Sequence, residues 1–366
     1  METCKKLFKE KTKTKGKGRV VIAMSGGMDS SVAAALLKES GDFEVVGVFM
    51  KFWSEGKTGR SQNKCCSTEA EKRARKVAAL LKIPFYVFDF KREFKKKIVD
   101  CFLKKIRQGV TPNPCVVCNK EIKFGLLFEK AKRFGADFIA TGHYACLREG
   151  KEGIKLMRAK DKNKDQSYFL WRLSQKQLEH VLFPIGGYTR QEVEKLSKKF
   201  KLPLSGVSKS LEICFVGDTI NDFLRSHLSI RPGKIITSNG KVLGTHNGLW
   251  FYTIGQRKGI MLPGGPYYVL DKDIKKNLLI VTKNERDLYK KEVGLKEVNW
   301  ILKDTPRFPL SVKAKIRHRH KSAEAVIVRK NKRYRLQFKR PQRAITPGQS
   351  AVFYKGNQVL GGAVIY

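Results

Sequence analysis

Residues 20–31 read VVIAMSGGMDSS: an apolar run, a glycine-rich turn and the start of an alanine-rich segment. The apolar run predicts a buried strand, and SVAAALLKES after it predicts a helix that ends at Gly41. Glycines between a strand and a helix let the backbone approach an anion, which then faces the free amides and positive dipole of the helix N-terminus. We therefore expect this turn to bind a phosphate group.

The side chains of the turn narrow the chemistry. Ser25, Ser30 and Ser31 add hydroxyl donors, and Asp29 beside a phosphate predicts magnesium binding or orientation of the leaving group. The sequence lacks G-x-x-x-x-G-K-[ST], so this is not the ATPase loop that grips a γ-phosphate with lysine. The alternative is a plain glycine turn before an ordinary helix, and the complete string argues against it.

The same strand–helix alternation continues along the chain. Apolar strands are expected at 44–50, 85–90 and 136–142, with helices at 68–82, 92–107 and 119–135. This pattern predicts an α/β fold with a doubly wound parallel sheet. Ligands of such sheets bind beyond the carboxyl ends of the strands, where the glycine-rich turn, Met50 and residues 141–143 fall.

The pattern changes after about residue 205. Thr189 and Glu192 form a capping box for one more helix, Asn239-Gly240 signals a hairpin, and alternating strands dominate from 266 onward. We expect a basic disordered arm at 1–18, a nucleotide-binding α/β domain at 19–205, a small mostly β central domain at 206–286 that carries Cys214, and a C-terminal β-barrel at 287–366.

Composition limits the partners and the compartment. The chain of 366 residues has 76 Lys+Arg against 33 Asp+Glu, a net charge of +43. Such an excess favours a polyanionic partner, with nucleic acid the leading candidate, although a generally lysine-rich proteome would give the same balance. No apolar run is long enough for a membrane span, and the N-terminus lacks the apolar stretch of a signal peptide, so we expect a cytoplasmic protein.

The cysteines include one pair with its own signal. Residues 111–124 read TPNPCVVCNKEIKF, a proline-bounded loop with C-x-x-C and a polar helix start. Eight cysteines in this length do not make a disulfide scaffold. The residues alone leave a zinc knuckle, a redox pair, part of a cluster site and half of a sulfur-handling site open.

Several motifs in order identify a family. SGGMDSS resembles the PP-loop of ATP pyrophosphatases, which adenylate an oxygen. Together with GVFMKFW, TPNPCVVCNKEIKFG, ATGHYA, KDQSYFL, EICFVGD, FYTIGQRKGI and ITPGQSAVFY…GGAV, it is similar to the tRNA-specific 2-thiouridylase family from about residue 19 to the end. The resemblance implies ATP-dependent adenylation of C2 of the wobble uridine in tRNA, followed by sulfur insertion.

The resemblance also assigns residues to roles. It places ATP against Ala23, Met24, Ser25, Gly26, Gly27, Met28, Asp29, Ser30, Met50 and Gly142. It places the target base against Asn113, Pro114 and Cys115, and tRNA against His143, Lys164, Asp165, Gln166, Arg317, His318 and Gln349, with the barrel as a tRNA-binding domain. His318 stands where the family usually has tyrosine, so a stacking role there is only partly retained.

Two cysteines match the family's sulfur chemistry. Cys118 matches the catalytic cysteine and Cys214 the persulfide-bearing one, and we expect them to meet above the sheet. Sulfur transfer needs a thiolate, which nearby lysines and the helix start at Asn119 would favour by lowering the pKa. The alternatives to a role in sulfur transfer are a structural C-x-x-C and a buried Cys214.

Cys115 departs from the family, which commonly has aspartate in N-P-D-x-x-C. Three thiols, Cys115, Cys118 and Cys214, would suit a [4Fe-4S] cluster with one open iron. Zinc is a weaker candidate because no fourth ligand is apparent. The rival is persulfide transfer that ends in a Cys118–Cys214 disulfide, with Cys115 as a bystander.

The remaining expectations concern partners and competing functions. ATP and Mg²⁺ are the expected cofactors, and a persulfide carrier protein, a cysteine desulfurase or sulfide is the expected sulfur source. A different PP-loop adenylating ligase that modifies tRNA would not need Cys118 and Cys214. An RNA-binding module with an inactive nucleotide fold is a further alternative, which the intact Ser25–Ser31 loop opposes.

Overall fold

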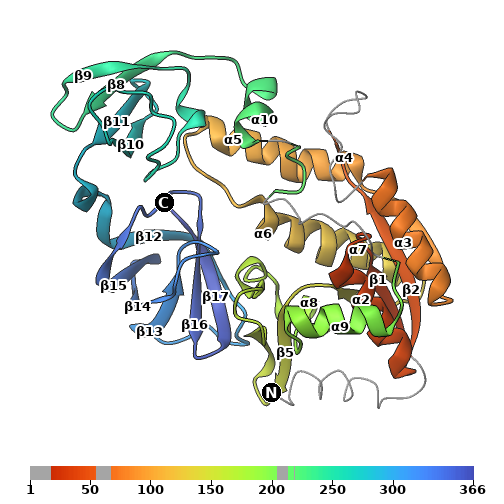
Figure 1. Ribbon diagram of the computed structural model, residues 1–366. Coiled ribbons are helices and arrows are strands. Elements are labelled where there is room, and N and C mark those ends of the chain that lie inside the picture. The colour runs from red at the N-terminus through yellow and green to blue at the C-terminus, as the bar shows by residue number, and fades with distance from the viewer. Residues whose placement is uncertain (1–17, 55–66, 204–212, 218) are drawn as a thin grey trace.

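The computed structural model describes residues 18–54, 67–203, 213–217 and 219–366. Within these ranges the strands form a five-stranded, a four-stranded and an eight-stranded sheet. Figure 1 shows the five-stranded sheet with its helices on the right, the four-stranded sheet at the upper left and the C-terminal strands at the lower left. The expected basic arm and the expected boundary at 205/206 fall at or beyond the edges of the described residues.

The first sheet is parallel, as the sequence predicts. Its order is β3-β2-β1-β4-β7, and its strands pair in parallel throughout. The strands are β1 (Gly18–Ala23), β2 (Phe43–Lys51), β3 (Phe85–Asp89), β4 (Phe138–Thr141) and β7 (Val181–Leu182). The first four match the predicted strands, and their carboxyl ends bring the glycine-rich turn, Met50 and Gly142 to one edge.

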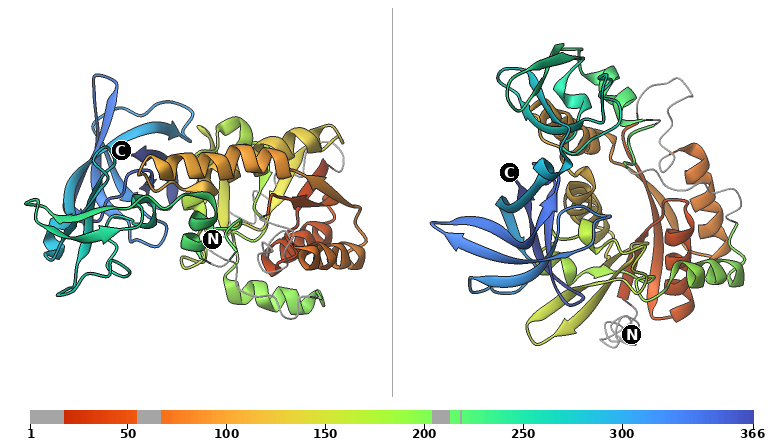
Figure 2. Two further views of the ribbon diagram at one scale, coloured as in Figure 1. Left: turned by 90° about the horizontal axis from the view of Figure 1, so that it is seen from above. Right: turned by 60° about the vertical axis from the view of Figure 1, so that its left-hand side comes forward.

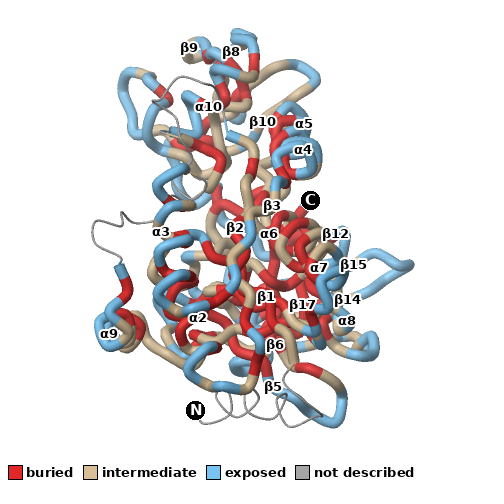
Figure 3. Tube along the Cα trace, turned by 90° about the vertical axis from the view of Figure 1, so that its right-hand side faces the viewer, coloured by how far each residue is buried: buried red, intermediate tan, exposed pale blue. Residues whose placement is uncertain are grey.

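Helices cover both faces of this sheet because its strands are apolar on both sides. Val20 and Ile22 of β1 pack in the cluster that contains α2 (Met28–Ser40), α3 (Thr68–Leu80) and α9 (Arg190–Lys199). Val21 and Ala23 pack on the opposite face. That face is covered by the helical segments α4 (Lys91–Phe94), η1 (Lys95–Asp100), α5 (Cys101–Arg107), α6 (Pro114–Cys118), η2 (Asn119–Leu126) and α7 (Leu127–Lys132). Figure 3 shows β1 buried between exposed outer helix faces.

The central domain is small and mostly β, as predicted. Its sheet has the order β10-β11-β8-β9. The elements are α10 (Ile220–His227), β8 (Gly233–Thr237), β9 (Val242–His246), β10 (Tyr268–Asp273) and β11 (Leu278–Thr282). Strands β8 and β9 are antiparallel, and Gly240 between them has φ of +86°, so the Asn239-Gly240 hairpin is confirmed.

The C-terminal strands close into a six-stranded barrel. They are β12 (Tyr289–Trp300), β13 (Leu310–Lys315), β14 (Ala323–Lys330), β15 (Arg333–Arg343), β16 (Ser350–Lys355) and β17 (Gln358–Ile365). Strand β12 pairs with both β15 and β17, which completes the ring. The interior holds apolar residues such as Ile327, Leu336 and Phe353. The predicted β-barrel is confirmed.

A hairpin from the first half of the chain extends this barrel. Strands β5 (Ala145–Gly150) and β6 (Gly153–Arg158) pair with each other, and β6 also pairs with β17, so that Met157 lies opposite Gln358. The sequence analysis did not predict this hairpin, which leads toward the short helix α8 (Gln175–Leu178). The views in Figure 2 show the barrel set against the side of the α/β domain.

None of the helices in the described ranges is both long enough and apolar enough to cross a bilayer.

Candidate active site

The glycine-rich turn lies at the carboxyl end of β1 and folds onto itself through its serines. The Ser25 amide donates to Ser30 Oγ at 3.1 Å, and the hydroxyls of Ser30 and Ser31 donate to the Gly27 carbonyl at 3.1 and 2.9 Å. Gly27 is the N-cap of α2 and provides no side-chain cap. The amides of the first turn therefore remain available to an anion.

Two glycines are required by close contacts at this turn. Gly26 has φ of +70°, and a Cβ there would lie 2.2 Å from the Ala70 carbonyl oxygen. A Cβ at Gly142, in the loop after β4, would lie 2.6 Å from the Ser30 amide nitrogen. Arg73 Nε donates to the Gly26 carbonyl at 3.1 Å and ties α3 to the turn. Any larger residue at 142 would push β4 away from the start of α2.

Asp29 is held by two partners from distant parts of the chain. Its Oδ1 accepts from the Tyr144 hydroxyl at 3.0 Å and from Arg190 at 2.9 Å, while Arg190 also pairs with Glu194 at 2.7 Å. Burial, followed by the Asp29 charge, raises the pKa of Tyr144, so this hydroxyl stays protonated and donates. In the described residues, Oδ2 of Asp29 takes part in no hydrogen bond.

The unpaired Oδ2 fits a magnesium ligand, since Mg²⁺ is usually held by one or two carboxylates together with substrate phosphates. Asp29 is the acidic residue in the first turn of α2. The sequence analysis missed Tyr144 and Arg190 as supporting residues. The sequence signal for Arg190 was its position directly after Thr189, the N-cap residue whose capping box is confirmed.

The C-x-x-C motif lies in a helix, and the expectation of a loop is wrong. Pro114 occupies the first turn of α6, and the helical path continues through η2 and α7. Asn113 is extended, with φ of −108° and ψ of 92°, and ends the preceding loop. Proline suits the first helical turn because its fixed φ matches the helix and its missing N–H has no partner to lose there.

Burial controls the two thiols of this motif. Cys118 is 5% exposed, and desolvation raises its pKa to about 11 despite the opposing effect of Lys123. Desolvation also raises the pKa of Cys115. The expectation of a low thiol pKa is therefore wrong for this structure, because the apolar core around Cys118 outweighs the nearby positive charge.

Cys214 lies at the rim of the core that contains Cys118. It is partly buried and packs against that cluster beside the fully buried Phe215. The meeting of Cys118 and Cys214 stays a prediction, because residues 204–212, which lead to Cys214, fall outside the described ranges. Among the described residues, no three His, Cys, Asp or Glu side chains are placed to hold a metal ion. A cluster on Cys115, Cys118 and Cys214 requires the same approach of Cys214 to the C-x-x-C helix and likewise stays a prediction.

Arg317 and Gln349, both expected at tRNA, join parts of the protein to each other. Arg317 donates to the Ala344 carbonyl at 2.9 Å and to Thr346 Oγ1 at 2.6 Å. Gln349 Nε2 donates to the Thr111 carbonyl at 2.9 Å and links the barrel to the loop before Asn113. Both side chains are partly buried.

The His318 ring makes an aromatic contact with another ring of this chain. Its imidazole lies 4.5 Å from the Phe169 ring, and its Nε2 lies 3.1 Å from the Asp165 carbonyl oxygen. Burial lowers the pKa of His318, so the ring is mainly neutral at pH 7. The stacking surface expected for RNA is thus partly taken by Phe169.

Two other residues expected at tRNA have buried side chains, and their contact with tRNA stays a prediction. Asp165 is 4% exposed and accepts from the amides of Ala159 and Ser167 in a tight turn. His143 is 9% exposed, bonds to Thr141 Oγ1 at 2.7 Å, and has a pKa far below its usual value because of burial. Their hydrogen bonds satisfy buried polar groups.

The other residues of this expected set lie nearer the surface. Lys164 is exposed and remains accessible. Gln166 is partly buried and accepts from the Tyr144 amide at 2.9 Å. Gln166 therefore supports the residue that holds Asp29.

Comparisons with known proteins cover almost the whole chain. Residues 18–218 match the tRNA methyl transferase HUP domain, residues 221–283 the tRNA methyl transferase PRC-barrel domain, and residues 290–365 the aminomethyltransferase β-barrel domain. A solved structure, the U34-tRNA thiolase NcsA from Methanococcus maripaludis with its [4Fe-4S] cluster, covers 62% of this chain and 74% of its own at 20% identity and a TM-score of 0.35. That similarity is too low to carry a conclusion about this chain.

Relatives that match over their full length carry one consistent name. The tRNA-specific 2-thiouridylase MnmA of Clostridium perfringens is 44% identical over 355 residues, which cover 95% of this chain and 98% of the relative. The protein of the same name from Coxiella burnetii is 43% identical over 357 residues, covering 94% and 97%. Because these identities extend over nearly the whole of both chains, the chain belongs to the tRNA-specific 2-thiouridylase MnmA family.

Proposed function

We propose that this protein is an ATP-dependent tRNA 2-thiouridylase that acts on the wobble uridine. ATP converts the C2 carbonyl oxygen to an O-adenylate with loss of pyrophosphate, and sulfur then displaces AMP from C2. One observation carries the proposal: the Ser25–Ser31 turn presents an uncapped helix N-terminus and a fixed Asp29 in a chain that is 44% identical to a 2-thiouridylase along 95% of its length.

The phosphate turn binds ATP through its backbone. The first-turn amides of α2 face the phosphates, and Gly26, Gly27 and Gly142 leave the backbone accessible. Residues 23–30 with Met50 and Gly142 form the nucleotide site of this proposal. Asp29 Oδ2 would hold Mg²⁺, which neutralises charge on the departing pyrophosphate. Arg190 and Tyr144 keep the Asp29 carboxylate aimed at that position.

Sulfur transfer follows the persulfide route in this proposal. The terminal sulfur of a Cys214 persulfide attacks C2, and the C–O bond to AMP breaks. The Cys118 thiolate then attacks Cys214 Sγ, which leaves sulfur on C2 and forms a Cys118–Cys214 disulfide that an external dithiol reduces. Cys118 must lose its proton for this step, and Lys123 assists because its charge lowers the thiol pKa. The alternative is an iron–sulfur cluster on Cys115, Cys118 and Cys214, which would require the same approach of Cys214 to the C-x-x-C helix.

The partners follow from this chemistry. The sulfur reaches Cys214 from a persulfide carrier protein or a cysteine desulfurase, and the expected compartment is the cytoplasm. Asn113, Pro114 and Cys115 stand at the start of the C-x-x-C helix, where the extruded uridine would lie. Exposed cations such as Lys164 contribute to tRNA binding.

The direct test is a reconstituted reaction. Purified protein, an unmodified tRNA transcript, ATP, Mg²⁺ and a persulfide donor should give 2-thiouridine at the wobble position, measured by nucleoside mass spectrometry. Cys118→Ser should bind tRNA and release pyrophosphate without forming the thionucleoside. A base that gains an amine would identify a different ligase, and tRNA binding with no ATP consumption would identify an RNA-binding module.

A further inference from the structure

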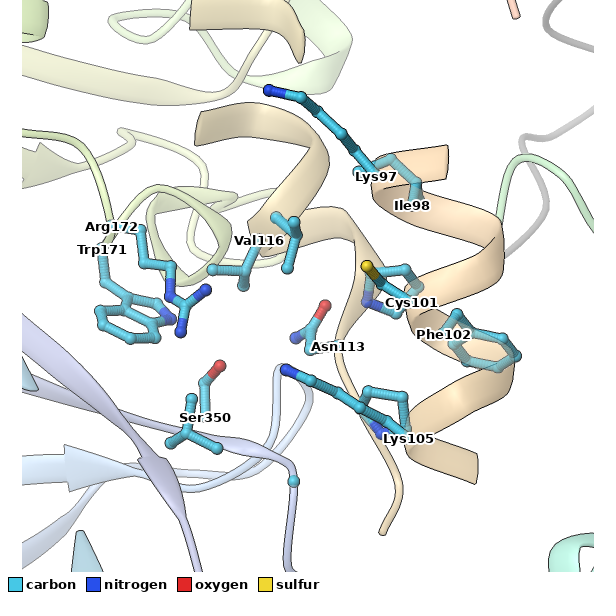
Figure 4. A pocket seen from close by; sticks show the side chains of 15 residues that line it. Lys97, Ile98, Cys101, Phe102, Lys105, Asn113, Val116, Trp171, Arg172 and Ser350 are labelled. Atoms are coloured by element: carbon cyan, nitrogen blue, oxygen red, sulfur yellow. The ribbon is translucent and has the colours of Figure 1, made fainter. Parts of the chain in front are cut away.

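A small cavity lies where the α/β domain meets the barrel. Its walls come from the helix of residues 95–107, the segment before α6, the Trp171-Arg172 pair and the strands β16 and β17 (Figure 4). The cavity volume is about 30 Å³, room for one or two water-sized groups. It is therefore too small for a nucleobase.

A buried donor without a partner faces this cavity. Trp171 is fully buried, and its Nε1 has no hydrogen-bond partner in the described structure. The Cβ position of Gly362 in β17 would lie 2.6 Å from the Trp171 ring, so the barrel holds the indole in place. Figure 4 shows the indole nitrogen turned toward the cavity. A buried N–H without an acceptor has lost its hydrogen bond to water without replacement, so a group that accepts from it is expected.

The neighbouring side chains also donate. Ser350 is 2% exposed, and its hydroxyl points into the cavity. Arg172 and Lys105 add positive charge, and no acidic residue lines the walls. Arg172 also pairs with Glu297, and Lys97 at the cavity edge pairs with Glu121 at 3.3 Å, but Lys105 has no ion pair with any residue that the structure describes. The site thus combines neutral donors with an uncompensated cation.

We propose that this cavity admits a nonbridging oxygen of a phosphate group, specifically of a backbone phosphate of the RNA strand beside the extruded uridine. The chemistry matches, since phosphate oxygens accept hydrogen bonds and carry negative charge. The position matches as well, because Asn113 lines the cavity and begins the segment expected at the target base. The RNA assignment rests on the proposed function, while inorganic phosphate is the alternative source of the same group.

The first test measures tRNA affinity against salt for matched lysine variants. Lys105 faces the cavity, whereas Lys104 is exposed on the same helix and does not line it. Lys105→Gln should weaken tRNA binding about three- to tenfold and lower the salt slope by nearly one charge. Lys104→Gln should have a clearly smaller effect. Equal effects of the two substitutions would overturn the proposal.

The second test observes the indole N–H itself. In protein with ¹⁵N-labelled tryptophan, the resonance missing from Trp171→Phe identifies Trp171 Nε1. This resonance should shift on titration with an anticodon stem-loop RNA and should stay in place with inorganic phosphate at equal concentration. A shift with inorganic phosphate and none with RNA would overturn the RNA assignment, and no shift with either would overturn the site. Thiolation by the wild-type protein, measured in parallel, separates failure of this site from failure of the proposed function.

Discussion

Cys118 shows how burial can oppose the chemistry that a residue has to perform. Its thiol lies in an apolar core that raises the pKa to about 11, and Lys123 is the group that lowers it. At neutral pH the thiol is protonated and inert toward oxidation and stray electrophiles. We infer that substrate binding has to change this environment before sulfur transfer, because the thiolate is the nucleophile.

The pKa of Cys118 predicts a pH dependence of its alkylation. The rate with iodoacetamide should rise about tenfold per pH unit between pH 7 and 10, because the thiolate fraction grows in that proportion below the pKa of about 11. Lys123→Met should slow the reaction at each pH, since removing the cation raises the pKa further. Peptide mass spectrometry separates Cys118 from the exposed Cys101, which serves as internal control. A rate at pH 7.5 equal to that of Cys101 would contradict the prediction.

Arg190 is predicted to position Asp29 for the nucleotide. The two side chains are 32% and 39% exposed, so the ion pair contributes about 0.5–1 kcal/mol. Arg190→Gln should therefore raise the KM for ATP about two- to fivefold in a pyrophosphate-release assay, with tRNA affinity unchanged. Arg75→Gln, which breaks the surface pair with Glu71, is the matched control and should leave this KM unchanged. An unaltered KM in Arg190→Gln would remove the residue from this role.

Cys115 is predicted to be dispensable for sulfur insertion. Because only Cys118 and Cys214 take part in the persulfide route, protein purified without oxygen should contain no stoichiometric iron. Cys115→Asp, which restores the common family residue, should retain activity, whereas Cys118→Ser should lose it. If Cys115→Asp lost iron and acid-labile sulfide together with its activity, this result would instead establish a cluster.

At the level of elements, the site depends on where strands and helices end. The carboxyl ends of β1 and β4 meet at the start of α2, and the helix that begins at Pro114 carries both C-x-x-C cysteines within its first five residues. Backbone contact makes the first junction rigid, since Gly142 lies directly against Asp29 and Ser30. Small changes at these junctions should therefore alter nucleotide binding more than changes elsewhere on the same helix.

Two glycines at opposite ends of α2 test this. Gly142→Ala should weaken ATP binding at least tenfold, because its Cβ would lie 2.6 Å from the Ser30 amide nitrogen and displace the phosphate turn. Gly41→Ala, at the C-cap with φ of +72° and no atom within 4 Å, should lower the free energy of unfolding by about 1 kcal/mol and leave ATP affinity unchanged. Calorimetric titration with ATP and thermal unfolding measure the two effects. Equal ATP affinity in both variants would contradict the rigid junction.

At the scale of the whole molecule, the chain carries an excess of positive charge, and the barrel is joined to the α/β domain. The β6–β17 pairing and the bond from Gln349 to Thr111 connect the barrel to the α/β domain. These connections place the barrel beside the C-x-x-C helix, so a bound tRNA can contact both. The net charge of +43 supplies long-range attraction for that polyanion.

Binding of tRNA is therefore predicted to depend strongly on salt. The affinity should fall at least a hundredfold between 50 and 200 mM salt, because each neutralised phosphate releases counterions. Removal of residues 1–18, which carry many lysines, should lower affinity only modestly and leave thiolation of bound tRNA intact. Filter binding over a salt series measures both effects. An affinity that stays constant over this range would contradict a phosphate-dominated interface.

The sequence by itself determined the features that depend on local pattern. Alternating apolar segments predicted the parallel sheet, the Gly41 and Thr189 caps predicted helix ends, and the barrel followed from period-two strands. Ordered motifs identified the family and the phosphate turn, because both are encoded in contiguous residues.

Only the tertiary structure decided what depends on contacts between distant residues. It paired Asp29 with Tyr144 and Arg190, joined the 145–158 hairpin to the barrel, and placed Trp171 Nε1 without a partner at the domain joint. It also shows that Cys118, His143 and Asp165 are buried, which the local sequence does not determine. Burial and pKa are set by the surrounding packing, which for Cys118 comes from segments as far apart in the sequence as Val21 and Val364 and leaves no local signal.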